Sequence, residues 1–102
     1  MIINNECWTI NLVDPGDTVL CTGIYDCALG VCDDNDKTIY ILNNLTKEKM
    51  RKVLCHEIVH AAMFSYNINL DWWTEEIVAD IIATYGDEIT NKTDYIFECL
   101  IK

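Results

Sequence analysis

Residues 46–66 read TKEKMRKVLCHEIVHAAMFSY, and the spacing of the hydrophobic residues within them is typical of a helix. Thr46 is a suitable N-cap, and Glu48 falls in the first turn, where the helix dipole favours a negative charge. Hydrophobic residues then recur at helical spacing: Met50, Val53, Leu54, Ile58, Ala61, Ala62 and Phe64. The pattern predicts one helix of about 30 Å, at about 1.5 Å per residue. Because its centre is apolar on nearly all sides, we expect this helix to lie inside the domain.

Three ionisable residues interrupt that apolar centre, in the string HEIVH. His56 and His60 are four residues apart, so both imidazoles lie on one face of a helix and can reach a single metal ion. Glu57 lies on the same side, within reach of a water molecule on that ion. The string therefore predicts two zinc ligands and a general base, with a third ligand supplied from elsewhere in the fold. Two imidazoles and a carboxylate also suit iron, cobalt or nickel.

A second helix is expected to begin near Asp71 or Thr74 and to include the string TEEIVAD. Glu76 and Asp80 are four residues apart in this string, so they share one face of the helix. We predict that Glu76 is the third metal ligand and that Asp80 accepts the Nδ1 proton of a ligand histidine. Glu75 is interpreted as a solvated carboxylate of the first turn.

The remaining sequence predicts the fold class. A strand is expected over residues 7–13, followed by the turn sequence DPGD, and a hairpin is expected between residues 28 and 42. Gly86 is expected to end or kink the second helix, and a third helical segment follows it to the C-terminus. We therefore expect one α+β domain over residues 1–102, with a mixed or antiparallel sheet of about three strands packed on two or three helices. The strand at 38–42 is expected to be the sheet edge on which an extended substrate lies.

Composition narrows the possible partners. The chain has 102 residues, and its 17 acidic and 7 basic side chains give a formal charge of −10. This excess repels phosphate, so we expect neither nucleic acid nor an anionic membrane surface as a partner. The first six residues do not resemble a signal peptide, and no stretch is long and apolar enough to span a membrane. The six cysteines are expected to be reduced and mostly buried, and we predict a cytoplasmic protein.

The string HEIVH, followed by TEEIVAD, resembles the gluzincin pattern, which is H-E-x-x-H and then N-E-x-x-x-D on a following helix. That pattern occurs in thermolysin-like peptidases and in ImmA/IrrE-type metallopeptidases, and the small size is most similar to minimal phage- or prophage-encoded members. The resemblance covers residues 53–88 and implies a minimal zincin-like domain. It implies Zn²⁺ bound by His56, His60 and Glu76, catalysis by Glu57, and a ligand histidine held by Asp80. Glu75 stands where the pattern has Asn, and no long C-terminal domain follows to supply a transition-state histidine.

We therefore expect a zinc-dependent endopeptidase in which Glu57 acts as base on a metal-activated water. The resemblance implies that its substrate is a regulatory protein. The sequence shows no clear donor for the tetrahedral oxyanion, and Tyr25 and Tyr40 are the candidates. Trp72 and Trp73 are expected either to rim the cleft or to cap the core.

Three alternatives stay open at this point. The chain could be a metal-stabilised binding protein with weak or no turnover, or an acidic inhibitor that mimics nucleic acid. The two histidines could also be bonded to Glu76 and Asp80 in the core without a metal. The sequence does not determine the oligomeric state.

Overall fold

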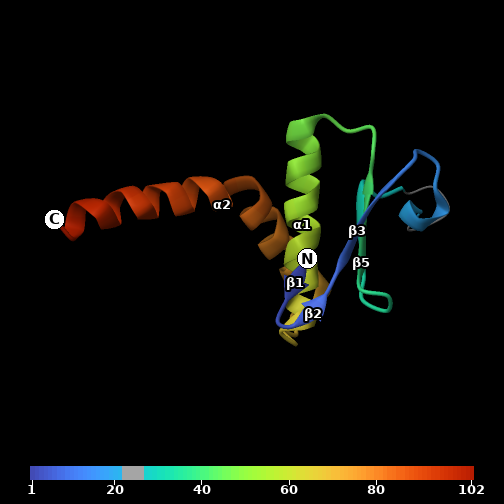
Figure 1. Ribbon diagram of the computed structural model, residues 1–102, viewed down its shortest axis with the longest axis horizontal. Helices are drawn as coiled ribbons and strands as arrows, with labels where there is room; N and C mark the ends of the chain where they lie inside the picture. Colours follow the sequence, from blue (N-terminus) through green and yellow to red (C-terminus); the bar gives the residue numbers. More distant parts are fainter. Residues whose placement is uncertain (22–26) are drawn as a thin grey trace.

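The computed structural model describes residues 1–21 and 27–102. The predicted α+β class is confirmed, with two helices, a two-stranded sheet and a three-stranded sheet. In chain order the elements are β1 (Ile2–Ile3), β2 (Glu6–Cys7), β3 (Thr9–Val13), the 3₁₀ turn η1 (Thr18–Leu20), β4 (Gly30–Asp33), β5 (Thr38–Leu42), α1 (Lys47–Ser65) and α2 (Trp72–Leu100). Figure 1 shows α1 standing beside the sheet while α2 projects away from it.

The three-stranded sheet has the order β3-β5-β4. β4 and β5 pair antiparallel and form the predicted hairpin, whereas β3 pairs parallel to β5 over its whole length, from Thr9 opposite Thr38 to Val13 opposite Leu42. The expectation that residues 38–42 form the sheet edge is therefore wrong, because β5 has a partner strand on each side. On the side of β5 that faces away from β3, the edge strand is β4.

The hydrophobic core lies between α1 and the sheet. Its fully buried members are Trp8, Ile39, Ile41 and Ala61. The indole Nε1–H of Trp8 donates a hydrogen bond to Ser65 Oγ at 2.8 Å, so the start of β3 is tied to the last residue of α1. At the other end of α1, the Thr46 side chain accepts a hydrogen bond from the backbone N–H of Lys49, as the sequence predicts for an N-cap.

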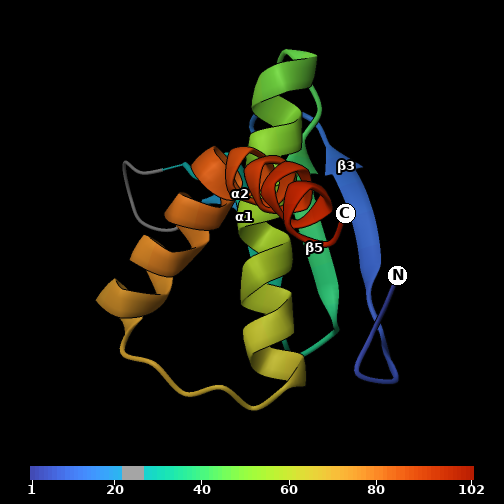
Figure 2. The ribbon, with the colours of Figure 1, turned by 90° about the vertical axis from the view of Figure 1, so that its left-hand side faces the viewer.

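α2 is one helix of 29 residues, capped by Asp71, whose side chain accepts from the backbone N–H of Thr74. The helix does not end at Gly86, so the expected third helical segment is the second half of α2. Figures 1 and 2 show that the ribbon bends within its length. Its first half runs beside α1, and its second half extends away from the domain.

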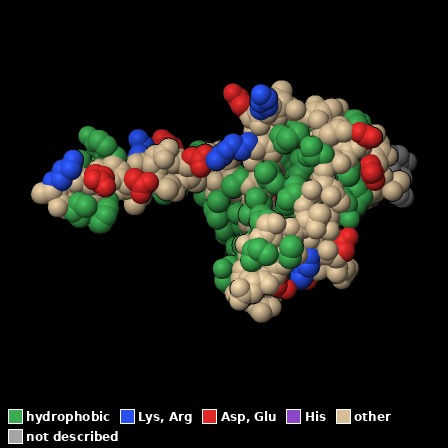
Figure 3. All heavy atoms as spheres, viewed as in Figure 1, with side chains coloured by type: hydrophobic (Ala, Val, Ile, Leu, Met, Phe, Trp, Pro, Cys, Tyr) green, Lys and Arg blue, Asp and Glu red, His purple; other side chains and the backbone are tan. Residues whose placement is uncertain are grey.

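The second half of α2 leaves hydrophobic side chains exposed, and Figure 3 shows them on the surface of the projecting arm. These residues include Ile89, Tyr95, Ile96, Phe97 and Leu100. In the described part of the chain, no helix is both long enough and apolar enough to cross a membrane.

All six cysteines are free, but the expectation that most are buried is wrong. Cys7, Cys21, Cys27 and Cys99 are exposed, while Cys32 and Cys55 are half-buried. The exposed ones lie in β2, on either side of residues 22–26, and in the projecting half of α2, all of which are outside the core.

Candidate metal centre

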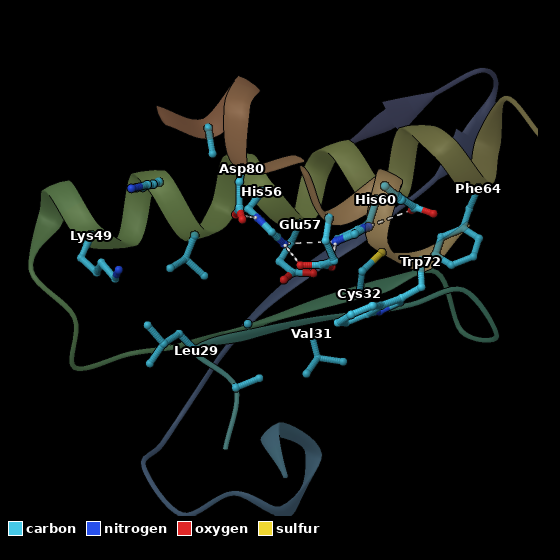
Figure 4. A pocket seen from close by; sticks show the side chains of 17 residues that line it. Leu29, Val31, Cys32, Lys49, His56, Glu57, His60, Phe64, Trp72 and Asp80 are labelled. Carbon is cyan, nitrogen blue, oxygen red and sulfur yellow. Dashed lines mark hydrogen bonds and ion pairs between the residues drawn. The ribbon is translucent and has the colours of Figure 1, made fainter. Parts of the chain in front are cut away.

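Two helices bring the candidate site residues together. α1 carries His56, Glu57 and His60, and the first half of α2 carries Glu76 and Asp80. The i and i+4 spacing directs both imidazoles to the side of α1 that faces α2, as Figure 4 shows for His56, His60 and Asp80. The structure therefore places all five predicted site residues around one point between the helices.

Three potential ligand atoms converge at that point. His60 Nε2 lies 2.7 Å from Glu76 Oε1, His56 Nε2 lies 3.3 Å from Glu76 Oε2, and the two Nε2 atoms are 3.1 Å apart. One ligand atom from each of these residues falls within 4.8 Å of the others. Ligand atoms bound at about 2.0–2.1 Å to a tetrahedral ion stand roughly 3.3 Å from each other. The three residues therefore come within roughly half an ångström of the spacing that a single ion requires.

The opposite nitrogen of each imidazole has a carboxylate partner. His56 Nδ1 lies 2.8 Å from Asp80 Oδ1, and His60 Nδ1 lies 2.8 Å from Glu75 Oε1. A carboxylate beside Nδ1 favours a proton on that nitrogen, which leaves the lone pair of Nε2 free. The two Nε2 atoms face each other and the Glu76 carboxylate. In the neutral tautomer that carries its proton on Nδ1, all of these groups are acceptors, and such a ligand set fits a metal cation.

Glu75 was interpreted from the sequence as a solvated carboxylate, and that interpretation is wrong. Its side chain is only 18% exposed and pairs with His60. The signal that could have found this role is the departure from the gluzincin pattern, in which Asn occupies the position before the ligand glutamate. A carboxylate there can accept the Nδ1 proton of the second histidine, just as Asp80 does for the first.

Burial and the neighbouring charges shift the pKa values of His60 and Glu57 in opposite directions. Burial is the largest influence on the His60 imidazole and lowers its pKa. The hydrogen bond with Glu75 and the negative charges of Glu57, Glu76 and Glu75 together outweigh burial, so the pKa of His60 is raised. For Glu57, which is 8% exposed, burial raises the pKa of the carboxyl, and the neighbouring histidines oppose this shift. A raised pKa suits a group that must accept and then release a proton.

A cleft of about 640 Å³ gives access to the centre. α1, the first half of α2 and the edge strand β4 line it, as Figure 4 shows. Lys49 and Lys52 lie at the N-terminal end of its α1 wall, and Phe64 and Trp72 lie at the other end. Gly30 brings the backbone of β4 against α1, because a Cβ atom there would stand 2.8 Å from Val53 Cγ1 and 3.0 Å from Glu57 Cγ.

The aromatic residues that the sequence suggested for the cleft differ in where they lie. Trp72 lines the cleft and is 65% exposed, so it belongs to the rim and does not cap the core. Trp73 is 72% exposed and is not part of the cleft wall. The Tyr40 hydroxyl donates to Asp36 at 2.9 Å in the hairpin, away from the cleft, and Tyr25 lies outside the described residues. Among the described residues, therefore, no tyrosine lines the cleft.

Comparison of the chain with protein-family models, with curated proteins and with solved structures gave no match. The resemblance to gluzincins stays a prediction that rests on the two strings HEIVH and TEEIVAD.

Proposed function

We propose that this protein is a zinc-dependent peptide hydrolase with its active site between α1 and α2. The observation that carries the proposal is the convergence of His56, His60 and Glu76 on one point, with Glu57 next to His56 on the α1 wall of the cleft. Two imidazoles and one carboxylate are a common catalytic zinc set, in which a fourth position stays open. The presence of Glu57 favours a hydrolytic function over metal binding alone, since the three ligand residues do not need Glu57 to bind a metal ion.

A bound zinc ion would supply a Lewis acid that polarises the substrate carbonyl and lowers the pKa of a water molecule to about 7. Glu57 takes the proton from the attacking water as the C–O bond forms, and it gives that proton to the nitrogen as the C–N bond breaks. Asp80 and Glu75 hold the two imidazoles in the orientation in which Nε2 is free.

The edge strand β4 supports an extended peptide as the substrate. The wall of the cleft opposite α1 is formed by residues 28–32, which are the first three residues of β4 and the two residues before it. Among the described residues β4 pairs with β5 alone, so its other edge can pair with an added strand through backbone hydrogen bonds. A peptide bound in this way would pass the metal centre in extended form, and a regulatory protein with an exposed or unfolded segment could supply it.

Native mass spectrometry with elemental analysis tests the metal centre. We expect one zinc per chain in the wild type and weaker binding in His60→Ala and Glu76→Gln. Glu98→Gln, on the exposed end of α2, is the matched control and keeps the metal. If zinc offered at neutral pH does not bind the wild type, the proposal is overturned.

Hydrolysis of an unstructured protein such as casein tests the chemistry. Glu57→Gln should keep the zinc and lose about 100- to 10,000-fold in rate, the usual contribution of a general base. Zinc binding with equal and negligible hydrolysis in both proteins would favour the second candidate, a metal-stabilised binding protein. The observation that favours this second candidate is that no tyrosine of the described residues lines the cleft to stabilise an oxyanion.

A further inference from the structure

Two rows of side chains run along the α1 wall of the cleft. Lys52, His56 and His60 follow one another at four-residue spacing, and Lys49, Val53 and Glu57 form the neighbouring row at the same spacing. Residues four apart lie on one face of a helix, so each row starts with a lysine and continues to the candidate centre. All six residues line the cleft.

The two lysines keep their charge available. Among the ion pairs of the described residues, Arg51 is bound to Asp87, and Lys37 is bound to Glu6 and Asp34. Neither Lys49 nor Lys52 has a carboxylate within 4.0 Å in that part of the chain. The first turn of α1, which contains Lys49, adds the positive end of the helix dipole to the same region. Figure 4 shows the Lys49 side chain directed from α1 towards Leu29 on the opposite wall.

We propose that Lys49 and Lys52 form a subsite for a carboxylate of the bound peptide, so that the cleft selects acidic segments. This inference rests on the proposed function, because it assigns a substrate class to the same cleft. Lys52 is one helical turn from His56 and Lys49 is two turns from Glu57, or about 6 and 12 Å along the axis. An extended peptide advances about 3.3 Å per residue, so the selected carboxylate lies roughly two to four residues from the cleaved bond.

The rest of the cleft sets the direction in which the peptide lies. Its middle carries four carboxylates, which repel an acidic side chain placed there, and they belong to Glu57, Glu75, Glu76 and Asp80. Its far end carries Phe64 and Trp72, which offer apolar surface. An acidic residue therefore fits only at the lysine end, even though the whole chain carries a charge of −10. At physiological salt the Debye length of about 8 Å screens the distant charges and leaves the close pairs.

Peptide binding to the Glu57→Gln protein tests the subsite without turnover. A set of fluorescently labelled hexapeptides, capped at both ends, carries one Glu at each position in turn, and reference peptides carry Gln at that position. One further neutral peptide has a free C-terminal carboxylate. We expect at least one Glu peptide to bind about fivefold more tightly than its Gln reference, as ion pairs with two exposed lysines allow. The gain should shrink as salt is raised.

The double variant Lys49→Gln with Lys52→Gln identifies the residues responsible. It should remove the preference for Glu, while Lys47→Gln, at the start of the same helix but outside the cleft wall, should keep it. A preference shown only by the peptide with the free carboxylate would identify the chain terminus as the source of the carboxylate. Equal affinities of all the peptides, the one with the free carboxylate included, would overturn the proposal, and so would a preference that survives the double variant.

The same titrations with and without zinc separate this inference from the proposed function. If the protein binds zinc and hydrolyses peptides but does not prefer Glu, the lysine subsite is ruled out and the proposed hydrolase function is kept. If the protein binds acidic peptides through the two lysines but binds no zinc, the subsite is kept and the proposed hydrolase function is ruled out.

Discussion

His56 Nδ1 lies 2.8 Å from a carboxylate oxygen of Asp80, and the pair mirrors the one between His60 and Glu75. The two carboxylates differ in exposure, because Asp80 is 69% exposed and Glu75 is 18% exposed. Solvent screens the outer pair more than the inner pair. The two histidines are therefore held by partners of unequal strength.

The difference in exposure predicts that variants of Asp80 and Glu75 lose zinc affinity to different extents. Residues that orient a metal-bound histidine typically contribute 10- to 100-fold, so about tenfold is expected for Asp80→Asn and close to 100-fold for Glu75→Gln. Competition with a zinc-binding dye measures both. Glu88→Gln, farther along α2, is the control and should change nothing. A larger loss for Asp80→Asn than for Glu75→Gln would contradict the assignment.

Gly30→Ala should destabilise the protein, because a Cβ atom would meet Val53, Glu57 and Ile41 at 2.8, 3.0 and 3.1 Å. Overpacking of this kind costs about 1–3 kcal/mol, and urea unfolding measures it. Gly86→Ala is the matched control. A Cβ there meets only Ile82, at 3.5 Å, so this change inside a helix should stabilise the protein by about 0.5–1 kcal/mol. If Gly30→Ala were also stabilising, β4 would not lie against α1 as described.

The Asp71 cap should make the start of α2 sensitive to acid. Hydrogen bonds from the backbone N–H and side chain of Thr74 lower the pKa of Asp71 below its ordinary value of 3.8. A lowered pKa means that the cap contributes stability above the unfolded-state pKa and loses it as the pH falls through the folded-state pKa.

Asn can accept the same backbone capping hydrogen bond as Asp, but it carries no charge and does not titrate. Asp71→Asn should therefore be less stable than the wild type at pH 7, and the difference should vanish near pH 2. Thermal melts at both pH values measure this. A difference that persists at low pH would show that the charge of Asp71 is not responsible.

Cys21 and Cys27 should be the first thiols to form a disulfide. They face each other across an isolated antiparallel bridge with their sulfur atoms 3.7 Å apart, and both are exposed. With oxidised glutathione as oxidant, the two thiols lose two protons and two electrons, and two molecules of reduced glutathione form. The hydrogen bond with Cys27 raises the pKa of the Cys21 thiol, so the reaction should speed up as the pH rises.

Peptide mapping after partial oxidation tests this order. Cys32 serves as the contrast, since burial raises the pKa of its thiol to about 12 and should keep it unreactive. A protein in which Cys7 or Cys99 is oxidised before the Cys21–Cys27 pair would contradict the prediction.

The sequence predicted the local features of this protein well. The Thr46 cap, the helix that carries HEIVH and the hairpin between residues 28 and 42 all form as expected, because each depends on residues close together in the chain. The four-residue spacing alone fixed the common face of His56 and His60, and the same spacing placed Glu76 and Asp80 together.

The contacts between these local elements depend on how the whole chain packs, and the sequence patterns do not predict them. β5 became the central strand because β3, far away in the sequence, pairs with it in parallel, and no local pattern encodes that choice. Glu75 became the partner of His60, and not a solvated side chain, because α2 packs against α1 at this point. The sequence also does not show that Lys49 and Lys52 line a cleft, because the cleft exists only where β4 and α2 pack against α1. Sequence periodicity fixes which residues share a face, but packing between distant elements decides what that face meets.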